Sequence, residues 1–305
     1  MNKPRLLVIG GTGFIGSHLL AATKDDWQVT SVSLNPPSPQ RFVSSVRYLK
    51  LDLTNYSAVN EVLSENYDYV VNLGGYVDHT LFQDGGHALI NTHFLALKNL
   101  ISVLSRKSLK RFVHIGSSDE YGNLPAPQNE NLREQPISPY SLAKVACTHL
   151  LQMLYRTEEF PAVVLRVFLT YGPNQDGKRF LPQIIKACLS GDEFPTSAGY
   201  QHRDFCYVED VVSAILLSLN SNKVEGQVIN IASGIPVSIR EIIDITRNLI
   251  GSGHPQYGKI PYRPSENMYL YASIEKAKNI LCWTPEVNLQ EGLIRTIESQ
   301  KNIQC

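Results

Sequence analysis

A tyrosine and a lysine four residues apart could form an acid–base pair in this chain. Tyr140 and Lys144 stand in the segment Ser-Pro-Tyr-Ser-Leu-Ala-Lys. Positions i and i+4 of a helix lie on one face, so the phenol and the ammonium can serve one site. A free tyrosine has a pKa of about 10, and a nearby lysine charge favours the phenolate and moves that pKa toward neutrality. Beside a nicotinamide, the pair could exchange a proton with a sugar hydroxyl or ketone while hydride crosses to or from the cofactor.

A glycine-rich turn near the N-terminus could hold such a cofactor. Gly10, Gly13 and Gly16 follow an apolar strand pattern and open a helical one. Glycines allow a tight turn, close approach of the backbone to a pyrophosphate, and close packing of helix on strand. A lone glycine triplet is weak evidence, but this position between strand and helix favours nucleotide binding over a plain turn. We expect Phe14 and Ile15, between the last two glycines, to lie at the cofactor as well.

The end of the second predicted strand bears on which dinucleotide is bound. Folds that prefer NAD usually place an Asp or Glu there to hold the ribose hydroxyls. Residues 29–35 contain no acid; Ser33 could donate to a 2′-phosphate, and Arg41 lies in the following loop. The sequence therefore favours NADP(H), with an NAD(H) ribose held by Asn35 or by the backbone as the alternative. After the third strand, Asp52 beside Leu53 could accept a hydrogen bond from the adenine amine or could cap the next helix.

Alternating strand and helix patterns must position these groups. We expect buried strands at Leu6–Gly10, Val29–Ser33, Val46–Lys50, Tyr69–Leu73, Arg111–Ile115 and Ala162–Val167. Helical patterns lie between them at Ser57–Glu65, His87–Arg106 and Ser138–Arg156. This alternation predicts an α/β fold, a Rossmann-type doubly wound parallel sheet with helices on both faces. Ligands of such sheets bind at the carboxyl ends of the strands.

The second half of the chain is less regular. We expect helices at Phe180–Ser190 and Ile239–Ile250, a strand at Val228–Ile231, and a loop and helix over Asp204–Leu219 that return to the sheet. The predicted organisation is a NAD(P)-binding Rossmann domain over residues 1–167, rejoined by residues 205–232. A smaller, interleaved C-terminal α/β substrate lobe would comprise residues 168–204 and 233–305.

Composition narrows the class of protein. The 305 residues carry 28 basic and 28 acidic side chains, which gives no indication of a nucleic-acid or membrane-surface partner. The five cysteines show no Cys-x-x-Cys pair and no histidine cluster at metal spacing, so we expect no metal site. The N-terminus enters a strand at once, and no apolar run reaches the ~18 residues of a membrane-spanning helix. We expect a soluble cytoplasmic enzyme.

Several longer motifs run in order along nearly the whole chain. They are GGTGFIGSHL at 10–19, LDLTN at 51–55, NLGG at 72–75, GSSDEYG at 116–122, SPYSLAK at 138–144, LRVFLTYGPNQ at 165–175, QHRDFCYVEDVV at 201–212 and CWTP at 282–285. Together they resemble the extended short-chain dehydrogenase/reductase family that acts on nucleotide sugars. The resemblance implies a Rossmann domain, a small substrate domain, and a homodimer built from helices 87–106 and 138–156.

The resemblance also implies roles for particular residues. It places the family's catalytic trio on Ser117, Tyr140 and Lys144: the serine hydrogen-bonds the reacting oxygen, the tyrosine is the acid/base, and the lysine bonds the nicotinamide ribose and lowers the tyrosine pKa. It places backbone close to the cofactor at Leu73, Gly74 and Gly75.

Arginines are the implied contacts to the substrate diphosphate. Arg203 matches the arginine that grips the diphosphate in the family, and Arg263 resembles a second. A planar guanidinium suits phosphate because it can donate two hydrogen bonds at once. The alternative for Arg203 is an ion pair with Asp204 or Asp210.

Two departures from the family pattern bear on the reaction. The 4,6-dehydratases tend to carry Thr-Asp-Glu or Thr-Ser-Glu where this chain has Ser-Ser-Asp, so Asp119 stands at the position of a proton-moving Glu with a shorter side chain. Asp119 could act in catalysis or hold a substrate hydroxyl, and Ser118 is expected at the substrate. Leu169 replaces an Asn that commonly bonds near the diphosphate. That contact could move to Thr170 or Arg179.

These observations favour an NADPH-dependent reductase of a nucleotide-linked 4-keto-6-deoxyhexose. In that reaction NADPH delivers hydride to C4, Tyr140 protonates the forming alkoxide, and Ser117 steadies the oxygen. One alternative is a 4-epimerase or 4,6-dehydratase with tightly bound NAD. A second is a non-catalytic NADP-sensing or scaffold protein, against which the intact trio argues.

Overall fold

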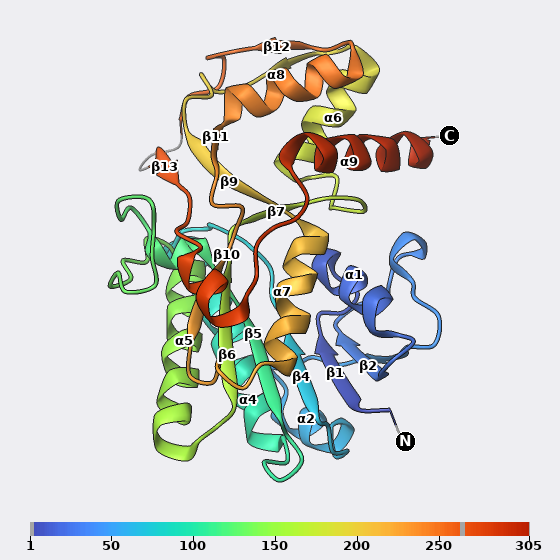
Figure 1. The fold of residues 1–305 in the computed structure, drawn as a ribbon, viewed down its shortest axis with the longest axis vertical. Helices are drawn as coiled ribbons and strands as arrows, with labels where there is room; N and C mark the ends of the chain where they lie inside the picture. Colours follow the sequence, from blue (N-terminus) through green and yellow to red (C-terminus); the bar gives the residue numbers. More distant parts are fainter. Residues whose placement is uncertain (1–2, 263–265, 305) are drawn as a thin grey trace.

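A parallel sheet of seven strands forms the centre of the computed structural model, which describes residues 3–262 and 266–304. Its order is β10-β6-β5-β4-β1-β2-β3, the arrangement of a doubly wound sheet (Figure 1). The strands are β1 (Arg5–Ile9), β2 (Gln28–Ser33), β3 (Arg47–Lys50), β4 (Tyr69–Asn72), β5 (Arg111–Ser117), β6 (Ala162–Val167) and β10 (Val228–Ile231). The predicted fold class is confirmed.

Alternating side chains of the strands face two separate hydrophobic cores. In β1, Leu6 and Val8 pack with α1 (Phe14–Thr23) and α7 (Val208–Asn220) on one face. Leu7 and Ile9 face the opposite core, which is completed by α2 (Tyr56–Val62), α4 (Ala96–Val103) and α5 (Pro139–Glu158). Because successive residues of a strand point to opposite faces, an uninterrupted apolar strand requires helices on both sides.

The helix predicted over His87–Arg106 forms one unbroken helical run, but it is not α-helical throughout. It consists of a short helix α3 (Ala88–Ile90), a π-helical turn over Asn91–Leu95, and α4. A π turn holds one residue more than an α turn, and such turns often lie at functional sites. Here the turn carries His93 toward the carboxyl end of β4.

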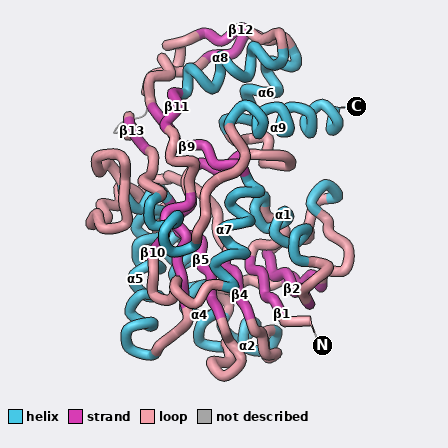
Figure 2. Tube along the Cα trace, in the orientation of Figure 1, coloured by secondary structure: helices cyan, strands magenta, loops and turns pink. Residues whose placement is uncertain are grey.

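The C-terminal lobe covers the carboxyl ends of the strands. Its apolar core is formed chiefly by α6 (Phe180–Ser190), α8 (Ile239–Ile250) and α9 (Leu289–Gln304). Strand β9 (His202–Tyr207) pairs with β7 (Leu169–Tyr171), β11 (Pro236–Ser238) and β13 (Tyr269–Leu270). A separate pair, β8 (Glu193–Pro195) and β12 (His254–Gln256), lies at the outer end, where short strands and helices alternate with long loops (Figure 2).

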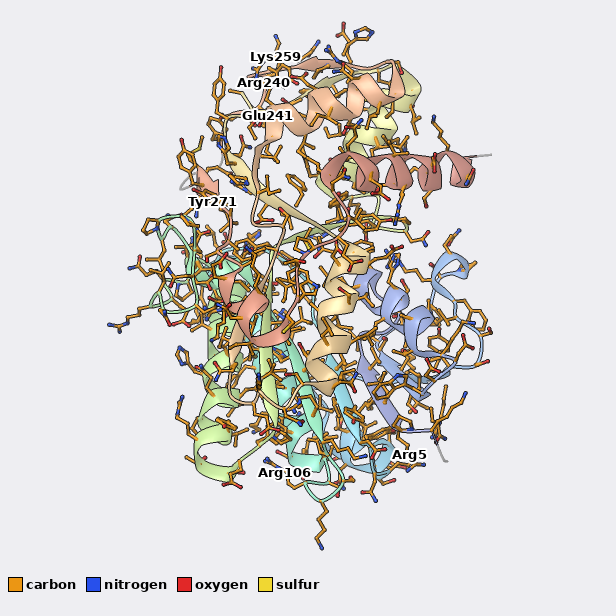
Figure 3. All side chains as sticks on the ribbon, in the orientation of Figure 1. Arg5, Arg106, Arg240, Glu241, Lys259 and Tyr271 are labelled. Carbon is orange, nitrogen blue, oxygen red and sulfur yellow. The ribbon has the colours of Figure 1, made fainter. Side chains whose placement is uncertain are left out.

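The two ends of the molecule show which way the sheet points. Figure 3 labels Arg240 and Glu241 on α8 at the far end of the lobe, and Arg5 and Arg106 at the opposite end. Since Arg5 begins β1, the carboxyl ends of the parallel strands point toward the lobe. The lobe is connected through β9 to α7 and then to β10, which pairs with β6, so the chain returns to the sheet. The division into two domains at the predicted boundaries stays a prediction. The boundary predicted between residues 204 and 205 falls inside β9.

Candidate active site

The glycine turn between β1 and α1 is too crowded for side chains. Gly10 has a φ of +78°, and a Cβ there would lie 3.0 Å from the carbonyl carbon of Leu73. A Cβ on Gly16 would lie 2.3 Å from the Gly10 carbonyl oxygen, which also accepts a hydrogen bond from the Gly13 amide at 3.0 Å. Only glycine permits this close approach of strand and helix.

The start of α1 is suited to an anion. Gly13 is the N-cap, and among the described residues no side chain caps the amides of the first turn, which includes Phe14 and Ile15. Unpaired amides at a helix N-terminus bind phosphate groups. The predicted cofactor residues of this segment therefore fit the pyrophosphate of a dinucleotide.

The end of β2 carries no carboxylate, and its polar groups contact neighbouring loops. The Ser33 hydroxyl accepts a hydrogen bond from the Thr12 amide at 3.3 Å, which ties β2 to the glycine turn. Asn35 is exposed. Arg41 donates from Nε and Nη2 to the Asn174 carbonyl at 3.1 and 2.7 Å. The guanidinium predicted to meet a ribose phosphate thus also holds the loop that follows β7.

The turn after β3 is ordered by its own side chains. The Asp52 carboxylate accepts from the amide and the hydroxyl of Thr54 at 2.9 and 2.8 Å. Asn55, not Asp52, caps α2, so the predicted capping alternative for Asp52 is wrong; an Asp two residues before a threonine closes a local turn instead. Asn99 of α4 donates to the Leu53 carbonyl at 2.9 Å and so fixes this turn.

The segment after β4 approaches the glycine turn through its backbone. The Leu73 amide donates to the Ile9 carbonyl at 3.0 Å, and the Gly74 amide donates to the Asn72 side chain at 3.0 Å. Gly75 has a φ of +113°, which favours glycine. The predicted cofactor segment 73–75 therefore lies beside the glycine turn.

The predicted trio meets at the carboxyl end of β5. Ser117 ends that strand, while Tyr140 lies in the first turn of α5, close enough to Ser117 for that residue to influence its pKa. Lys144, one turn later, donates from Nζ to the Ile115 carbonyl at 2.8 Å. Tyr140 and Lys144 are each 5% exposed. The structure therefore brings three buried polar side chains together.

The protonation of Tyr140 differs from the sequence-based expectation. Burial raises the pKa of Tyr140, the nearby Asp119 raises it further, and the nearby Ser117 hydroxyl opposes both. Lys144 lies 6.0 Å from the centre of the Tyr140 ring, and burial lowers the pKa of its own ammonium. The direction is opposite to the lowering that the Tyr–Lys spacing predicted, because burial outweighs an ammonium that donates to a carbonyl rather than to the phenol.

A buried ion pair beneath the trio escaped the sequence analysis. Glu120 and Arg166 are both fully buried, and Arg166 donates from Nε to the Glu120 carboxylate at 2.9 Å. The same carboxylate accepts from the Ser117 amide at 2.9 Å and from the Thr148 hydroxyl at 2.8 Å. Glu120 thereby fixes Ser117 at the end of β5. The capping pattern of Ser117 and Glu120 could have indicated this role.

Two histidines beside Tyr140 were also missed. The His93 ring centre is 5.3 Å from that of Tyr140, at an interplanar angle of 74°. Its Nε2 donates to the Tyr76 carbonyl at 3.0 Å, and burial, with Lys144 nearby, lowers its pKa to about 3. The His79 ring centre is 6.1 Å from that of Tyr140. No sequence spacing connects either histidine with Tyr140, because the contacts join segments far apart in the chain.

Asp119 lies at the edge of the trio. Its Oδ2 is 3.7 Å from Nε2 of His79. Burial raises the pKa of Asp119, while His79 and then Arg203 oppose that rise, and Arg179 acts in the same direction as they do. The predicted substrate contacts Arg203 and Arg179 therefore lie close enough to influence Asp119. Ser118, the other predicted substrate contact of this turn, is buried.

Arg203 pairs with neither acid that the sequence suggested. It donates from Nη1 to the carbonyls of His202 and Asn267, each at 2.8 Å, and forms an ion pair with Glu266. The suggested partners Asp204 and Asp210 instead accept hydrogen bonds from backbone amides, including those of Ser233 and Glu286.

The remaining predicted substrate contacts are dispersed. The Thr170 hydroxyl donates to the Phe168 carbonyl at 3.3 Å, Leu169 is exposed on β7, and Arg179 is exposed at the start of α6. Arg263 lies outside the described residues. Within residues 3–262 and 266–304, no group of three or more His, Cys, Asp or Glu side chains could hold a metal ion. In the same part of the chain, no helix is long and apolar enough to cross a membrane.

Known proteins resemble the chain over almost its full length. The model of the NAD dependent epimerase/dehydratase family matches residues 6–232. A dTDP-glucose 4,6-dehydratase of Streptomyces niveus is 27% identical over 312 residues, 96% of this chain and 92% of that protein. A UDP-glucose 4-epimerase of Thermotoga maritima, solved with UDP-glucose, has a TM-score of 0.91 and 26% identity over 99% of this chain and 100% of that one. A UDP-glucuronic acid 4-epimerase of Bacillus cereus, solved with UDP-glucuronic acid and NAD, has a TM-score of 0.87 and 26% identity over 98% and 99% of the two chains. The chain therefore belongs to the NAD-dependent epimerase/dehydratase family and is an enzyme of the extended short-chain dehydrogenase/reductase type.

Proposed function

We propose that this enzyme oxidises C4 of a hexose carried on a nucleoside diphosphate and returns the hydride to the same sugar while keeping NAD bound. The hydride would return to C4 in a 4-epimerase and to C6 in a 4,6-dehydratase. The observation that carries this proposal is the meeting of Ser117, Tyr140 and Lys144 in one buried corner, beside a glycine turn that fits a dinucleotide. The relatives support it because their names place their reactions at C4 of UDP- or dTDP-sugars.

The chain's own groups divide the work at the sugar oxygen. Ser117 and Tyr140 lie close to each other, so both can bond the same C4 oxygen of a substrate. The phenol form of Tyr140, which its raised pKa favours, can protonate an alkoxide at C4, and in the oxidation step the phenolate form would accept the proton of the C4 hydroxyl. Burial of the pair excludes competing water. When bound, the nicotinamide supplies the two-electron exchange with C4.

The diphosphate would be held from the lobe. Arg203 and Arg179 lie close enough to Asp119 for their charges to lower its pKa, and Asp119 lies beside Tyr140. Arg203 is half-buried and already pairs with the carboxylate of Glu266. A phosphate oxygen could replace that carboxylate, since a guanidinium binds both in the same planar geometry. We include Ser118 as a contact to the sugar and Arg203 as the main contact to the diphosphate.

A reductase that uses NADPH is the second candidate. One observation favours it: β2 ends on Ser33 without a carboxylate, so nothing at that position repels a 2′-phosphate, and Arg41 lies nearby. Its substrate would be a nucleotide-linked 4-keto-6-deoxyhexose. The NAD bound in the relative from Bacillus cereus favours the main proposal instead.

The proposal extends to assembly and location. A homodimer through helices 87–106 and 138–156 is supported by Leu142 and Met153 of α5, which are 47% and 40% exposed although apolar. The balanced charge of the chain and the absence of a spanning helix among its described residues fit a cytoplasmic enzyme.

The bound dinucleotide is the first test. The purified protein is denatured, the released nucleotide is identified, and the enzyme is then incubated with UDP-glucose and with dTDP-glucose. Tightly held NAD and conversion of a sugar without net formation of reduced nucleotide would support the main proposal. Exchangeable NADPH, consumed by a dTDP-linked 4-keto-6-deoxyhexose but by neither glucose conjugate, would overturn it in favour of the reductase.

A further inference from the structure

A second candidate acid–base group lies beside the trio, on the loop that follows β4. His79 stands between Asp78 and Thr80, where the Asp78 carboxylate accepts from the Thr80 amide at 2.8 Å and from its hydroxyl at 2.6 Å. This closed turn fixes the backbone on both sides of His79. The His79 side chain is 46% exposed, so a ligand could reach it.

The surroundings of His79 orient its ring. Nε2 is 3.7 Å from the Asp119 carboxylate, and the ring meets Tyr140 edge to face, at 84°. A carboxylate on this side favours the proton on Nε2 and leaves a lone pair on Nδ1. Asp119 is itself held, because its amide donates to the Ser117 hydroxyl at 3.2 Å.

These contacts place a base next to the groups that would bind the reacting oxygen. The centres of the His79 and Tyr140 rings are 6.1 Å apart. The two rings are in edge-to-face contact, so a sugar bound at Tyr140 would lie against His79 as well. A sugar whose C4 oxygen bonds Ser117 and Tyr140 would therefore present C3 or C5 toward His79.

We propose that His79, oriented by Asp119, removes and returns a proton on the carbon next to the keto carbon of a 4-keto sugar. This inference rests on the proposed function, which supplies the ketone. The ketone acidifies the neighbouring C–H bond. The proton passes to Nδ1 of His79, and the C–H electron pair becomes the C=C bond of an enolate. The negative charge resides on the C4 oxygen, where Ser117 and Tyr140 donate hydrogen bonds. Return of the proton to carbon restores the ketone and regenerates neutral imidazole.

This step would extend the chemistry beyond inversion at C4. Return of two electrons to C4 requires an acid–base group at the oxygen only, which Tyr140 provides. A base at the adjacent carbon permits solvent exchange or inversion there, or loss of a leaving group from the next carbon of the sugar. The structure offers His79 for this role rather than Asp119 alone, because Asp119 is the less exposed of the two, at 27%.

Hydrogen–deuterium exchange on a ready-made 4-keto sugar tests the step directly. The full-length protein, saturated with NAD⁺, is incubated in D₂O with dTDP-4-keto-6-deoxyglucose, and loss of the C3 and C5 proton signals is followed by NMR. Oxidised dinucleotide cannot reduce the ketone, so exchange reports proton transfer alone. We expect exchange well above the protein-free rate, and a decrease of about 10²-fold or more in His79→Phe.

Two further variants separate chemistry from structure. In His79→Ala, added imidazole should restore part of the exchange, which a merely structural loss would not allow. His87→Phe alters an exposed histidine of the same segment and should exchange like the wild type. Calorimetric titration with the same sugar should give similar affinities for all of them.

Wild-type exchange no faster than the protein-free rate despite sugar binding would overturn the inference, as would undiminished exchange in His79→Phe. Neither result contradicts the proposed function, because a separate measurement, the conversion of UDP-glucose or dTDP-glucose, tests that function. Exchange that depends on His79 in an enzyme that converts neither glucose conjugate would contradict the proposed function alone.

Discussion

The two sides of the active site are built in different ways. On the side of the sheet, Ser117, Tyr140 and Lys144 are buried. Lys144 donates to the Ile115 carbonyl, and the Ser117 amide donates to the carboxylate of a fully buried ion pair. On the side of the loops, His79 and Arg179 are exposed and extend from segments without regular pairing.

This difference separates two tasks. Buried groups with fixed partners are positioned before a ligand arrives, which suits the step at the sugar oxygen. Exposed groups on loops can change from one enzyme to another without disturbing the core, which suits substrate selection. The division fits a family whose relatives carry out both dehydration and epimerisation.

Tyr140→Phe should have the largest effect on the reaction. The substitution removes only the hydroxyl, so the buried packing of the ring remains. We expect kcat to fall by about 10²–10⁴-fold, the usual contribution of a positioned acid–base group. Affinity for a nucleotide sugar, measured by calorimetry, should change little. Turnover within about tenfold of the wild type would contradict the acid–base role.

Glu120→Gln should have the largest effect on stability. It removes the charge that compensates Arg166, which is 0% exposed, and weakens the bond that holds the Ser117 amide. Breaking a buried pair costs about 3–5 kcal/mol, and the lower end is expected because Glu134 also pairs with Arg166. Urea unfolding measures the loss.

A matched control lies at the surface. Glu158 pairs with Arg106 at 3.2 Å, and both side chains are exposed. Glu158→Gln should leave the unfolding curve unchanged, since exposed pairs contribute little. Equal losses in the two variants would show that burial of the Glu120 pair has no special importance.

The sequence predicted the sheet side far better than the loop side. Alternating apolar strands and amphipathic helices specify a doubly wound sheet through local periodicity, and β1, β2 and β6 begin and end within a residue of expectation. Tyr140 and Lys144 could be predicted because they lie one turn apart on one helix, and Ser117 because it stands in a local motif. The π turn at Asn91–Leu95 could not, because no local spacing indicates it; in the folded chain its His93 lies against Gly75.

The loop side depends on contacts between distant segments. His79 meets Asp119 and Tyr140 only after β4, β5 and α5 have packed together. Arg203 was predicted as a phosphate ligand or a partner of nearby acids, yet it pairs with Glu266, 63 residues away. The Glu120–Arg166 pair likewise joins residues 46 apart. No sequence period carries such information, because tertiary packing decides it.

Gly16→Ala tests the sheet side through its backbone. An added Cβ would lie 2.3 Å from the Gly10 carbonyl oxygen and 2.7 Å from the Gly11 Cα, so the turn must shift. We expect a loss of about 1–3 kcal/mol of stability by urea unfolding, together with weaker dinucleotide binding. Gly177→Ala is the control, since a Cβ there meets no atom within 4 Å. Unchanged dinucleotide affinity in Gly16→Ala would refute the role of this turn.

His93 contacts both sides of the site. Its replacement should have the smallest effect on stability, and that effect should depend on pH. Its ring contacts Gly75 of the loop and Tyr140 of α5, and burial lowers its pKa to about 3. The unfolded chain binds a proton at this residue below a pH of about 6.5, whereas the folded protein does not. Stability is therefore lost as the pH falls from about 6.5 toward 3, by about 1.4 kcal/mol per pH unit from this group.

In His93→Asn, the difference between unfolding free energies at neutral pH and in mild acid should shrink accordingly. His87→Asn, at an exposed position, should keep the wild-type difference. If His93→Asn kept the wild-type difference as well, burial would not hinder the protonation of His93. The boundary between the two sides would then be open to water.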